Sequence, residues 1–261
     1  MLPEVPRRAV LAQGGCAVPD AAQCASRVRS SYGDHTGSQV VRLSRTQVAQ
    51  VMSTEAQLAQ PTRIVAPYIT QWGAEQDLTP RLVVRPGGGV GYASELPADR
   101  DDHDVLWQQV TARPGLGKPE FGKVHPWRQR RAMRELLCQV CAGPADRTRD
   151  GVLWLLRDYR GDWPSWPEGM GSVEPPICAP CVATSLRRCP ALQRGAVAVR
   201  AREFPIAGVR GTLYRQGVLA PAVLGVANLP YDDPNVRWMV AAAQIRELRR
   251  CTFISAEGFL E

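Results

Sequence analysis

The sequence has little of several features, and each shortage excludes a class of protein. No apolar run approaches the roughly 20 residues that a bilayer-spanning helix needs, although 44% of the 261 residues are hydrophobic. The only export-like segment follows Arg7 and Arg8, and its apolar stretch ends at Gln13 after four residues, short of the about 7 expected at minimum. Eight cysteines show no disulfide framework. We therefore expect a cytoplasmic protein without membrane contact.

Histidine is scarce and catalytic motifs are absent. The three histidines are His35, His103 and His125. A glycine cluster over 86–89 lacks the Gly-Lys-Ser/Thr and the following helix of a phosphate loop, so a hairpin turn is favoured there. No nucleophile–base pair and no cofactor fingerprint is visible. These absences favour a non-enzymatic protein and leave an enzyme of unknown reaction as the third hypothesis.

Two Cys-x-x-Cys pairs are the most informative feature of the chain. Cys138 and Cys141 form the first pair, Cys178 and Cys181 form the second, and 36 residues separate the pairs. Each pair has the spacing that lets two sulfurs chelate one ion. Four thiolates would fill every position around a tetrahedral Zn²⁺ ion, so the cofactor would be structural zinc. The alternatives are unrelated buried thiols and thioredoxin-type redox pairs.

The residues around the cysteines predict the elements of a zinc finger. A Gly143-Pro144 turn follows the first pair, 151–156 is a short apolar strand, and 182–188 is a helix that ends before Pro190. Knuckle, strand and helix in this order resemble a treble-clef zinc finger over about residues 134–192. The chain as a whole also resembles a group of actinobacterial proteins, and that resemblance implies no function.

The treble-clef resemblance has one informative departure. Treble clefs include the HNH endonucleases, and the resemblance implies a histidine between the cysteine pairs that activates water. No histidine lies there in this chain, and the carboxylates of Asp146, Asp150, Asp158 and Asp162 lack that general base. The resemblance therefore implies a finger without the nuclease chemistry.

The chain divides into four regions by composition. Residues 1–51 are poor in aromatics and lack apolar periodicity, which predicts a disordered extension, or an over-extended gene start before Met52. Residues 52–117 predict a small α/β region, with helical spacing over 62–72 and a hairpin over 82–92. Residues 118–194 hold a basic segment and the finger. Strands over 196–200, 208–214 and 217–219 follow in 195–261.

The predicted fold class is α+β. A structural zinc treble clef with four cysteines lies between two small β-containing regions, and an amphipathic C-terminal helix ends the chain. Asp232-Asp233-Pro234 begins this helix, which runs to about Arg250. Its apolar stripe consists of Trp238, Ala241, Ala242, Ile245 and Leu248.

Positive charge is concentrated around the predicted finger. Residues 118–215 contain 17 Lys and Arg against 9 Asp and Glu, whereas the whole chain has 32 against 25. Phe121, His125 and Trp127 are interleaved with the densest part, which suits phosphate contacts and base stacking. Coding bias is an alternative explanation for the surplus of arginine, because only two of the 32 basic residues in the chain are lysines. The candidate nucleic-acid-binding residues are Lys118, Lys123, Arg128, Arg130, Arg131 and Arg134.

Two functional hypotheses are favoured over the hypothesis of an enzyme. The first is a non-enzymatic zinc-stapled protein that binds DNA or RNA through the basic segment. The second is a protein-interaction or scaffold module, in which the loop over 163–167 presents Trp163 and Trp166 to another protein.

Overall fold

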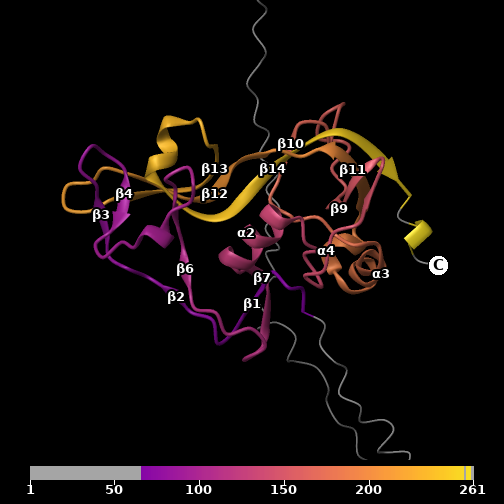
Figure 1. The fold of residues 1–261 in the computed structure, drawn as a ribbon, viewed down its shortest axis with the longest axis horizontal. Coiled ribbons are helices and arrows are strands. Elements are labelled where there is room, and N and C mark those ends of the chain that lie inside the picture. Colours follow the sequence, from indigo (N-terminus) through magenta and orange to yellow (C-terminus); the bar gives the residue numbers. More distant parts are fainter. Residues whose placement is uncertain (1–65, 256, 260–261) are drawn as a thin grey trace, which may run out of the picture. The chain divides into compact units, whose positions relative to one another are not determined.

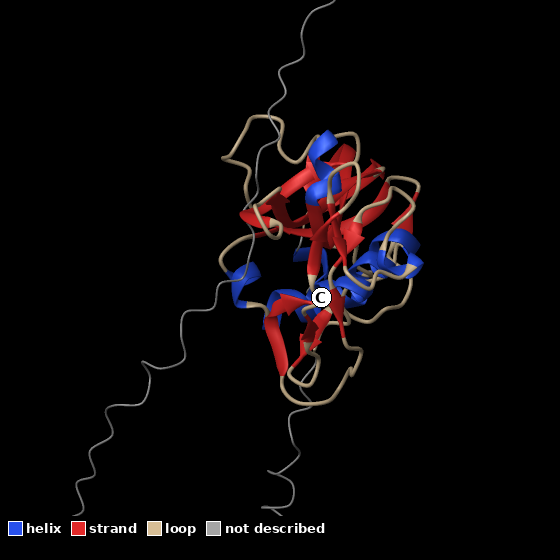
Figure 2. Ribbon diagram, turned by 90° about the vertical axis from the view of Figure 1, so that its left-hand side faces the viewer, coloured by secondary structure: helices blue, strands red, loops and turns tan. Residues whose placement is uncertain are grey.

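The computed structural model describes residues 66–255 and 257–259. The predicted extension over 1–51 lies outside these residues. Helices and strands are both present, as the α+β class predicted, and strands predominate (Figure 2). Within the described residues, no helix has the length and apolar character needed to cross a membrane.

The described strands form one large sheet and three two-stranded sheets. The small sheets pair β1 (Thr70–Trp72) with β7 (Pro119–Val124), β2 (Asp77–Leu78) with β6 (Gln109–Val110), and β3 (Leu82–Val84) with β4 (Val90–Tyr92). The large sheet contains β5 (Leu106–Trp107), β8 (Arg147–Thr148), β9 (Gly151–Arg157), β10 (Met170–Ser172), β11 (Ala196–Glu203), β12 (Ile206–Arg215), β13 (Ala222–Pro230) and β14 (Met239–Ile254). The pairing of β3 with β4 confirms the hairpin predicted over 82–92.

The helices are short. They are α2 (Pro126–Glu135), α3 (Ala179–Arg188) and α4 (Pro190–Gln193), with 3-10 turns η1 (Pro97–Asp99), η2 (Pro234–Trp238) and η3 (Glu257–Phe259). In Figure 1, α3 and α4 lie beside β9 and α2 lies beside β14.

Strand β14 lies in the middle of the large sheet and joins its two halves. The main path of the sheet runs β13, β12, β14, β11, β9, β8, and both β5 and β10 pair with β14 off this path. The first half of β14 pairs with β12, and its last residues pair with β11 (Figure 1). Strands from distant parts of the sequence are therefore joined through one 16-residue segment.

The predicted C-terminal helix over 232–250 is wrong beyond its first turn. Asp233 does cap a helix, because its carboxylate accepts a hydrogen bond from the N–H of Asn235 at 2.7 Å, but that helix is η2 and ends at Trp238. In β14 a register shift opposite Arg210 and Gly211 adds one residue to the strand. Three residues of the predicted stripe, Ala241, Ile245 and Leu248, are buried in this strand, and their spacing of four and three residues imitates a helix.

Helix α2 supplies hydrogen-bond partners to the backbone of Gln244 and to the side chain of Arg246, both buried in β14. The side chain of Gln129 donates to the carbonyl of Gln244 at 2.9 Å and accepts from its N–H at 2.9 Å. Arg246 Nε donates to the carbonyl of Met133 at 2.9 Å, at the end of α2. These contacts hold α2 against the sheet and satisfy polar groups that burial would otherwise penalise.

Two shorter predictions also fail. Residues 70–72 of the expected helix over 62–72 form strand β1, and residues 62–65 lie outside the described residues. The strand expected over 217–219 is part of the connection between β12 and β13. Val218 and Leu219 are consequently exposed at 101% and 97%.

Gly151 provides a test of the pairing between β9 and β11. Its φ of +116° suits glycine, and an added Cβ would overlap the backbone oxygen of Ala201. We expect Gly151→Ala to lower the free energy of unfolding by at least about 2 kcal/mol, measured by urea denaturation. Gly161→Ala is the control, since nothing lies within 4 Å of its added Cβ. Equal stability of the two variants would contradict this pairing.

Candidate metal centre

The two cysteine pairs meet at one point in the structure. The Sγ atoms of Cys138, Cys141, Cys178 and Cys181 all lie within 4.8 Å of one another. Cys141 Sγ and Cys178 Sγ are 3.7 Å apart, which matches the edge of about 3.8 Å in a sulfur tetrahedron with Zn–S bonds of about 2.3 Å. The four cysteines could therefore hold one metal ion, and the all-sulfur donor set favours zinc.

A tight turn after α2 positions the first pair. Cys138 donates its N–H to the carbonyl of Gly143 at 2.7 Å, and Ala142 donates to the carbonyl of Cys138 at 2.9 Å. Ala142 has a left-handed φ of 61°. The N–H of Val140 donates to Cys138 Sγ at 3.4 Å. The turn thereby directs both sulfurs of the pair to one side.

Helix α3 positions the second pair. Cys178 is its N-cap residue and Cys181 lies in its first turn, where the helix dipole favours negative charge. The preceding residue, Ile177, is fully buried and donates its N–H to the carbonyl of Leu153 in β9 at 2.9 Å. Gln139 in the first turn donates to the carbonyl of Pro176 at 3.0 Å. The two segments are thus joined directly beside the sulfurs.

The local elements predicted for the finger are confirmed. The apolar strand over 151–156 is all of β9 except its last residue, and the helix over 182–188 is most of α3, which begins three residues earlier at Ala179. Leu153 and Leu155 of β9 pack with Cys138 in one apolar cluster. The side of β9 that faces the cysteines is therefore apolar.

The electrostatics of the cluster call for a cation. Burial raises the pKa of Cys178 to about 11, and burial together with the neighbouring sulfurs raises the pKa of Cys181 as well. Burial also acts to raise the pKa of Cys141, but the N–H of Gly143 and the nearby cysteines lower it on balance. Four thiols in this space cannot all ionise side by side, and a divalent ion removes that repulsion.

Comparison of the chain with protein-family models, with curated proteins and with solved structures found no match. The interpretation of the site therefore rests on its geometry.

Arg128 is unavailable to a phosphate, contrary to its assignment from the sequence. Its guanidinium donates to the two carboxylate oxygens of Glu75 at 2.7 and 2.6 Å, and to the carbonyl of Thr70 at 2.7 Å. Only 4% of the Arg128 side chain and 0% of the Glu75 side chain are exposed. This pair anchors α2 to the residues around β1 and serves the fold.

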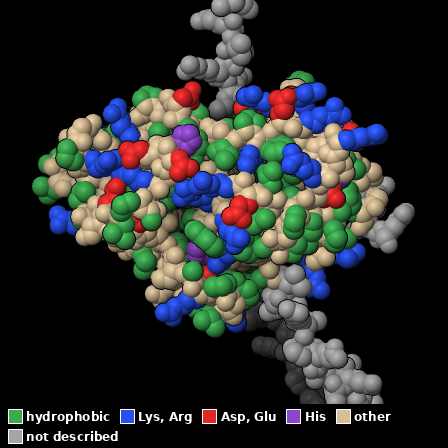
Figure 3. Space-filling model, in the orientation of Figure 1, with side chains coloured by type: hydrophobic (Ala, Val, Ile, Leu, Met, Phe, Trp, Pro, Cys, Tyr) green, Lys and Arg blue, Asp and Glu red, His purple; other side chains and the backbone are tan. Residues whose placement is uncertain are grey.

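The other basic residues of the segment differ in accessibility. Arg130 is half-buried, with its guanidinium 4.6 Å from the ring centroid of Trp107. Lys118 is exposed. Figure 3 shows Asp and Glu side chains among the Lys and Arg side chains on the visible face. The remaining three are exposed and form surface ion pairs, Lys123 with Glu120, Arg131 with Glu135, and Arg134 with Asp102.

The aromatic loop over 163–167 does not present the predicted anchors. Trp166 is only 3% exposed and belongs to a core cluster that includes Trp154 and Leu248. Trp163 packs against the same cluster. The scaffold hypothesis therefore loses Trp166 as a contact residue.

The surface near α2 is hollowed on both sides of Trp127. One hollow has a volume of about 540 Å³ and includes Trp107 and Arg130 in its lining. The other has about 400 Å³ and includes Trp72 and Arg131. Local sequence patterns do not reveal these hollows, because the segments that line them come together only in the fold.

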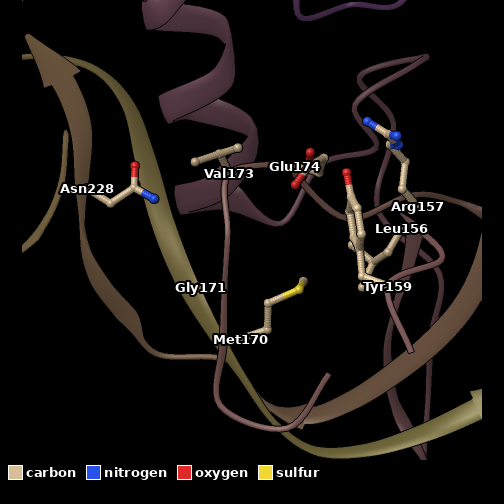
Figure 4. Close-up of a pocket in the computed structure, with 8 residues that line it drawn as sticks. All are labelled: Leu156, Arg157, Tyr159, Met170, Gly171, Val173, Glu174 and Asn228. Atoms are coloured by element: carbon tan, nitrogen blue, oxygen red, sulfur yellow. The ribbon is translucent and has the colours of Figure 1, made fainter. Parts of the chain in front are cut away.

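A third hollow, shown in Figure 4, is too small for a ligand. Its volume is about 30 Å³, enough for one or two water molecules. Met170, Tyr159, Glu174 and Asn228 are among the side chains that line it.

We expect the purified protein to contain one zinc ion per chain, bound by the four cysteines. Cys138→Ser should lose zinc and lower the melting temperature together, because zinc binding and folding are coupled. Metal content by mass spectrometry and thermal unfolding measure the two effects. Cys189→Ser is the control and should keep both, since Cys189 is outside the cluster. Stoichiometric zinc in a Cys138→Ser, Cys178→Ser double variant would refute the assignment.

The Glu75–Arg128 pair predicts a pH-dependent contribution to stability. Burial opposes ionisation, but the hydrogen bonds from Arg128 and from the backbone lower the pKa of Glu75 from 4.5 to about 2. The contribution is therefore complete above pH 4.5 and is lost as the pH falls towards 2. Glu75→Gln should reduce the free energy of unfolding at pH 7 by about 3 kcal/mol.

Urea denaturation across pH measures this effect. The difference between wild type and Glu75→Gln should shrink below pH 4.5. Glu135→Gln, which removes the exposed partner of Arg131, is the control and should cost less than about 1 kcal/mol. A Glu75→Gln variant as stable as Glu135→Gln at pH 7 would contradict the role assigned to the buried pair.

Proposed function

We propose that the protein is a non-enzymatic, zinc-stabilised protein that binds single-stranded nucleic acid on the surface formed by α2 and β7. One observation carries the proposal. Trp127 is 58% exposed and stands between two hollows, each of which has a second indole in its lining. Exposed aromatic rings beside arginines are the contacts on which unpaired bases stack.

The metal centre has a structural role in this proposal. Four thiolates fill the coordination sphere of zinc and leave no position for a reacting water. The order of knuckle, β8–β9 hairpin and α3 supports a treble-clef type of finger. Because the first cysteine turn directly follows α2, zinc would fix the end of the helix that carries Trp127.

The aromatic and basic side chains near Trp127 match the chemistry of an unpaired strand. Phe121 in β7 is 57% exposed, and the guanidinium of Arg131 lies 5.8 Å from the ring centroid of Trp127. Each stacked base contributes about 1–3 kcal/mol in single-strand-binding proteins. Two exposed rings therefore provide stacking positions that do not depend on sequence.

The charges that could contact phosphates are the exposed ones. Lys118 is exposed, and the side chains of Lys123, Arg131 and Arg134 are 61%, 44% and 46% exposed. The surface ion pairs of Lys123, Arg131 and Arg134 contribute at most about 1 kcal/mol each to stability. Phosphates can therefore replace the carboxylates in these pairs. Arg128 is left out of this set because Glu75 holds it in the interior.

A second candidate, a protein-interaction module, is favoured by a different surface. Strand β13 lies at the end of the main path of the large sheet, and the side chains of Val223, Leu224 and Val226 on it are 63%, 57% and 67% exposed. Val218 and Leu219 in the preceding connection extend this apolar surface. Exposed apolar patches commonly mark contacts with another protein.

Binding of a fluorescently labelled single strand tests the first candidate. Trp127→Ala should weaken binding about tenfold through the loss of stacking, measured by fluorescence anisotropy. Replacing Arg131 and Lys123 with Gln should weaken binding to all sequences and flatten its dependence on salt. Arg249→Gln is the control, because Arg249 is exposed on β14 and paired with Glu247.

The same assay can refute the proposal. If the protein retains neither DNA nor RNA at low salt, whether single- or double-stranded, nucleic-acid binding fails and the protein-interaction candidate takes its place. An affinity that Trp127→Ala leaves unchanged would place the binding surface elsewhere.

A further inference from the structure

The hollow of about 540 Å³ has the size and lining of a ligand site. Pockets for small ligands commonly have volumes of about 300–1,000 Å³, with apolar walls and a few polar groups. Here Trp107, Trp127, Leu96 and Val110 supply apolar surface. Two polar side chains in the lining, His125 and Arg130, have nitrogen atoms without a hydrogen-bond partner among the described residues.

His125 is buried without a hydrogen-bond partner. Its side chain is 2% exposed, and neither Nδ1 nor Nε2 has a partner among the described residues. The nearest carboxylate oxygen, on Glu75, is 3.9 Å from Nε2, too far for a hydrogen bond. Burial and then the charge of Arg128 lower the pKa of His125, so the neutral ring offers one donor and one acceptor.

Arg130 is the second buried donor at this hollow. Its Nε is buried and has no partner among the described residues. The neighbouring Arg131 and Arg134, in contrast, each have a carboxylate partner. The Arg130 guanidinium lies over the Trp107 ring, 4.6 Å from the ring centroid. This stacking restrains the orientation of the planar guanidinium and its N–H donors.

Unpaired buried polar groups are costly, which points to a missing partner. Each one has given up its hydrogen bonds to water without replacing them, and most such groups in folded proteins do have a partner. A ligand that fits this hollow must present hydrogen-bond acceptors to Arg130, and an acceptor or a donor to His125. The indole walls additionally favour a flat aromatic body.

Guanine satisfies these requirements better than the other bases. Its O6 and N7 are adjacent acceptors that match the donor fork of an arginine. Adenine has an amino group in place of O6, which would oppose a donor. Unpaired cytosine has adjacent acceptors in O2 and N3, but its single ring covers less of the two indoles than a purine does. A carboxylate or phosphate also matches the fork but makes no use of the two indoles.

We propose that the hollow between Trp107 and Trp127 is a guanine site, in which Arg130 and His125 bind the base. The base can come from a free guanine nucleotide or from a strand held on the neighbouring surface. In the second case the inference deepens the proposed function and rests on it.

Titration of the full chain with nucleotides tests the site. Tryptophan fluorescence and calorimetry should show guanosine monophosphate binding at least about tenfold more tightly than adenosine monophosphate. Arg130→Lys keeps the charge and removes the fork, so the preference should fall below about threefold. Arg249→Lys is the control and should keep the preference, because Arg249 lies on β14, outside this surface, and is paired with Glu247.

Circular dichroism melting of each variant keeps the test independent of folding. Preferential guanine binding that Arg130→Lys abolishes in a folded protein supports the inference. Equal binding of all nucleotides, binding of inorganic phosphate alone, or no binding would overturn it.

Oligonucleotides distinguish this inference from the proposed function. If guanosine monophosphate binds and no strand binds, the guanine site stands and the proposed function fails. If strands bind but neither guanine-containing strands nor guanosine monophosphate is preferred, the proposed function stands and the guanine site fails.

Discussion

Four cysteine sulfurs lie within 4.8 Å of one another where the turn after α2 meets the start of α3. Thiolates at this separation repel each other, so the arrangement is stable as a set of anions only around a cation. The cluster joins the turn after α2 to the start of α3, and β9 packs between these segments. Because α2 carries Trp127, Arg130 and the buried Arg128, the metal centre would also determine how the candidate binding surface is held.

Helix α2 is attached to the rest of the molecule by buried polar contacts rather than by apolar packing alone. Arg128 pairs with Glu75 at its beginning, Gln129 bonds to the backbone of Gln244, and Arg246 reaches the carbonyl of Met133 at its end. Each contact gives a buried polar or charged group a hydrogen-bond partner, which offsets the cost of removing that group from water. A basic surplus counted from the sequence therefore overstates the positive charge at the surface, since Arg128 and Arg246 are buried.

What could be predicted from the sequence depended on how local the signal was. The four cysteines, the strand over 151–156, the helix over 182–188 and the hairpin over 82–92 follow from spacing and turn residues within a few positions. The strand over 239–254 could not be predicted in this way, because a bulge disturbs its alternation and its contacts with Gln129 of α2 are distant in sequence. The role of Arg128 was hidden likewise, since Glu75 is 53 residues away in sequence.

X-ray absorption at the zinc edge of the protein, purified without added metal, would show which atoms surround the metal. We expect zinc with four sulfur neighbours at about 2.3 Å and no nitrogen or oxygen neighbour. A first shell that includes nitrogen or oxygen would mean that Cys138, Cys141, Cys178 and Cys181 do not close the site. Protein that is folded and free of metal would contradict the claim that a cation holds this structure together.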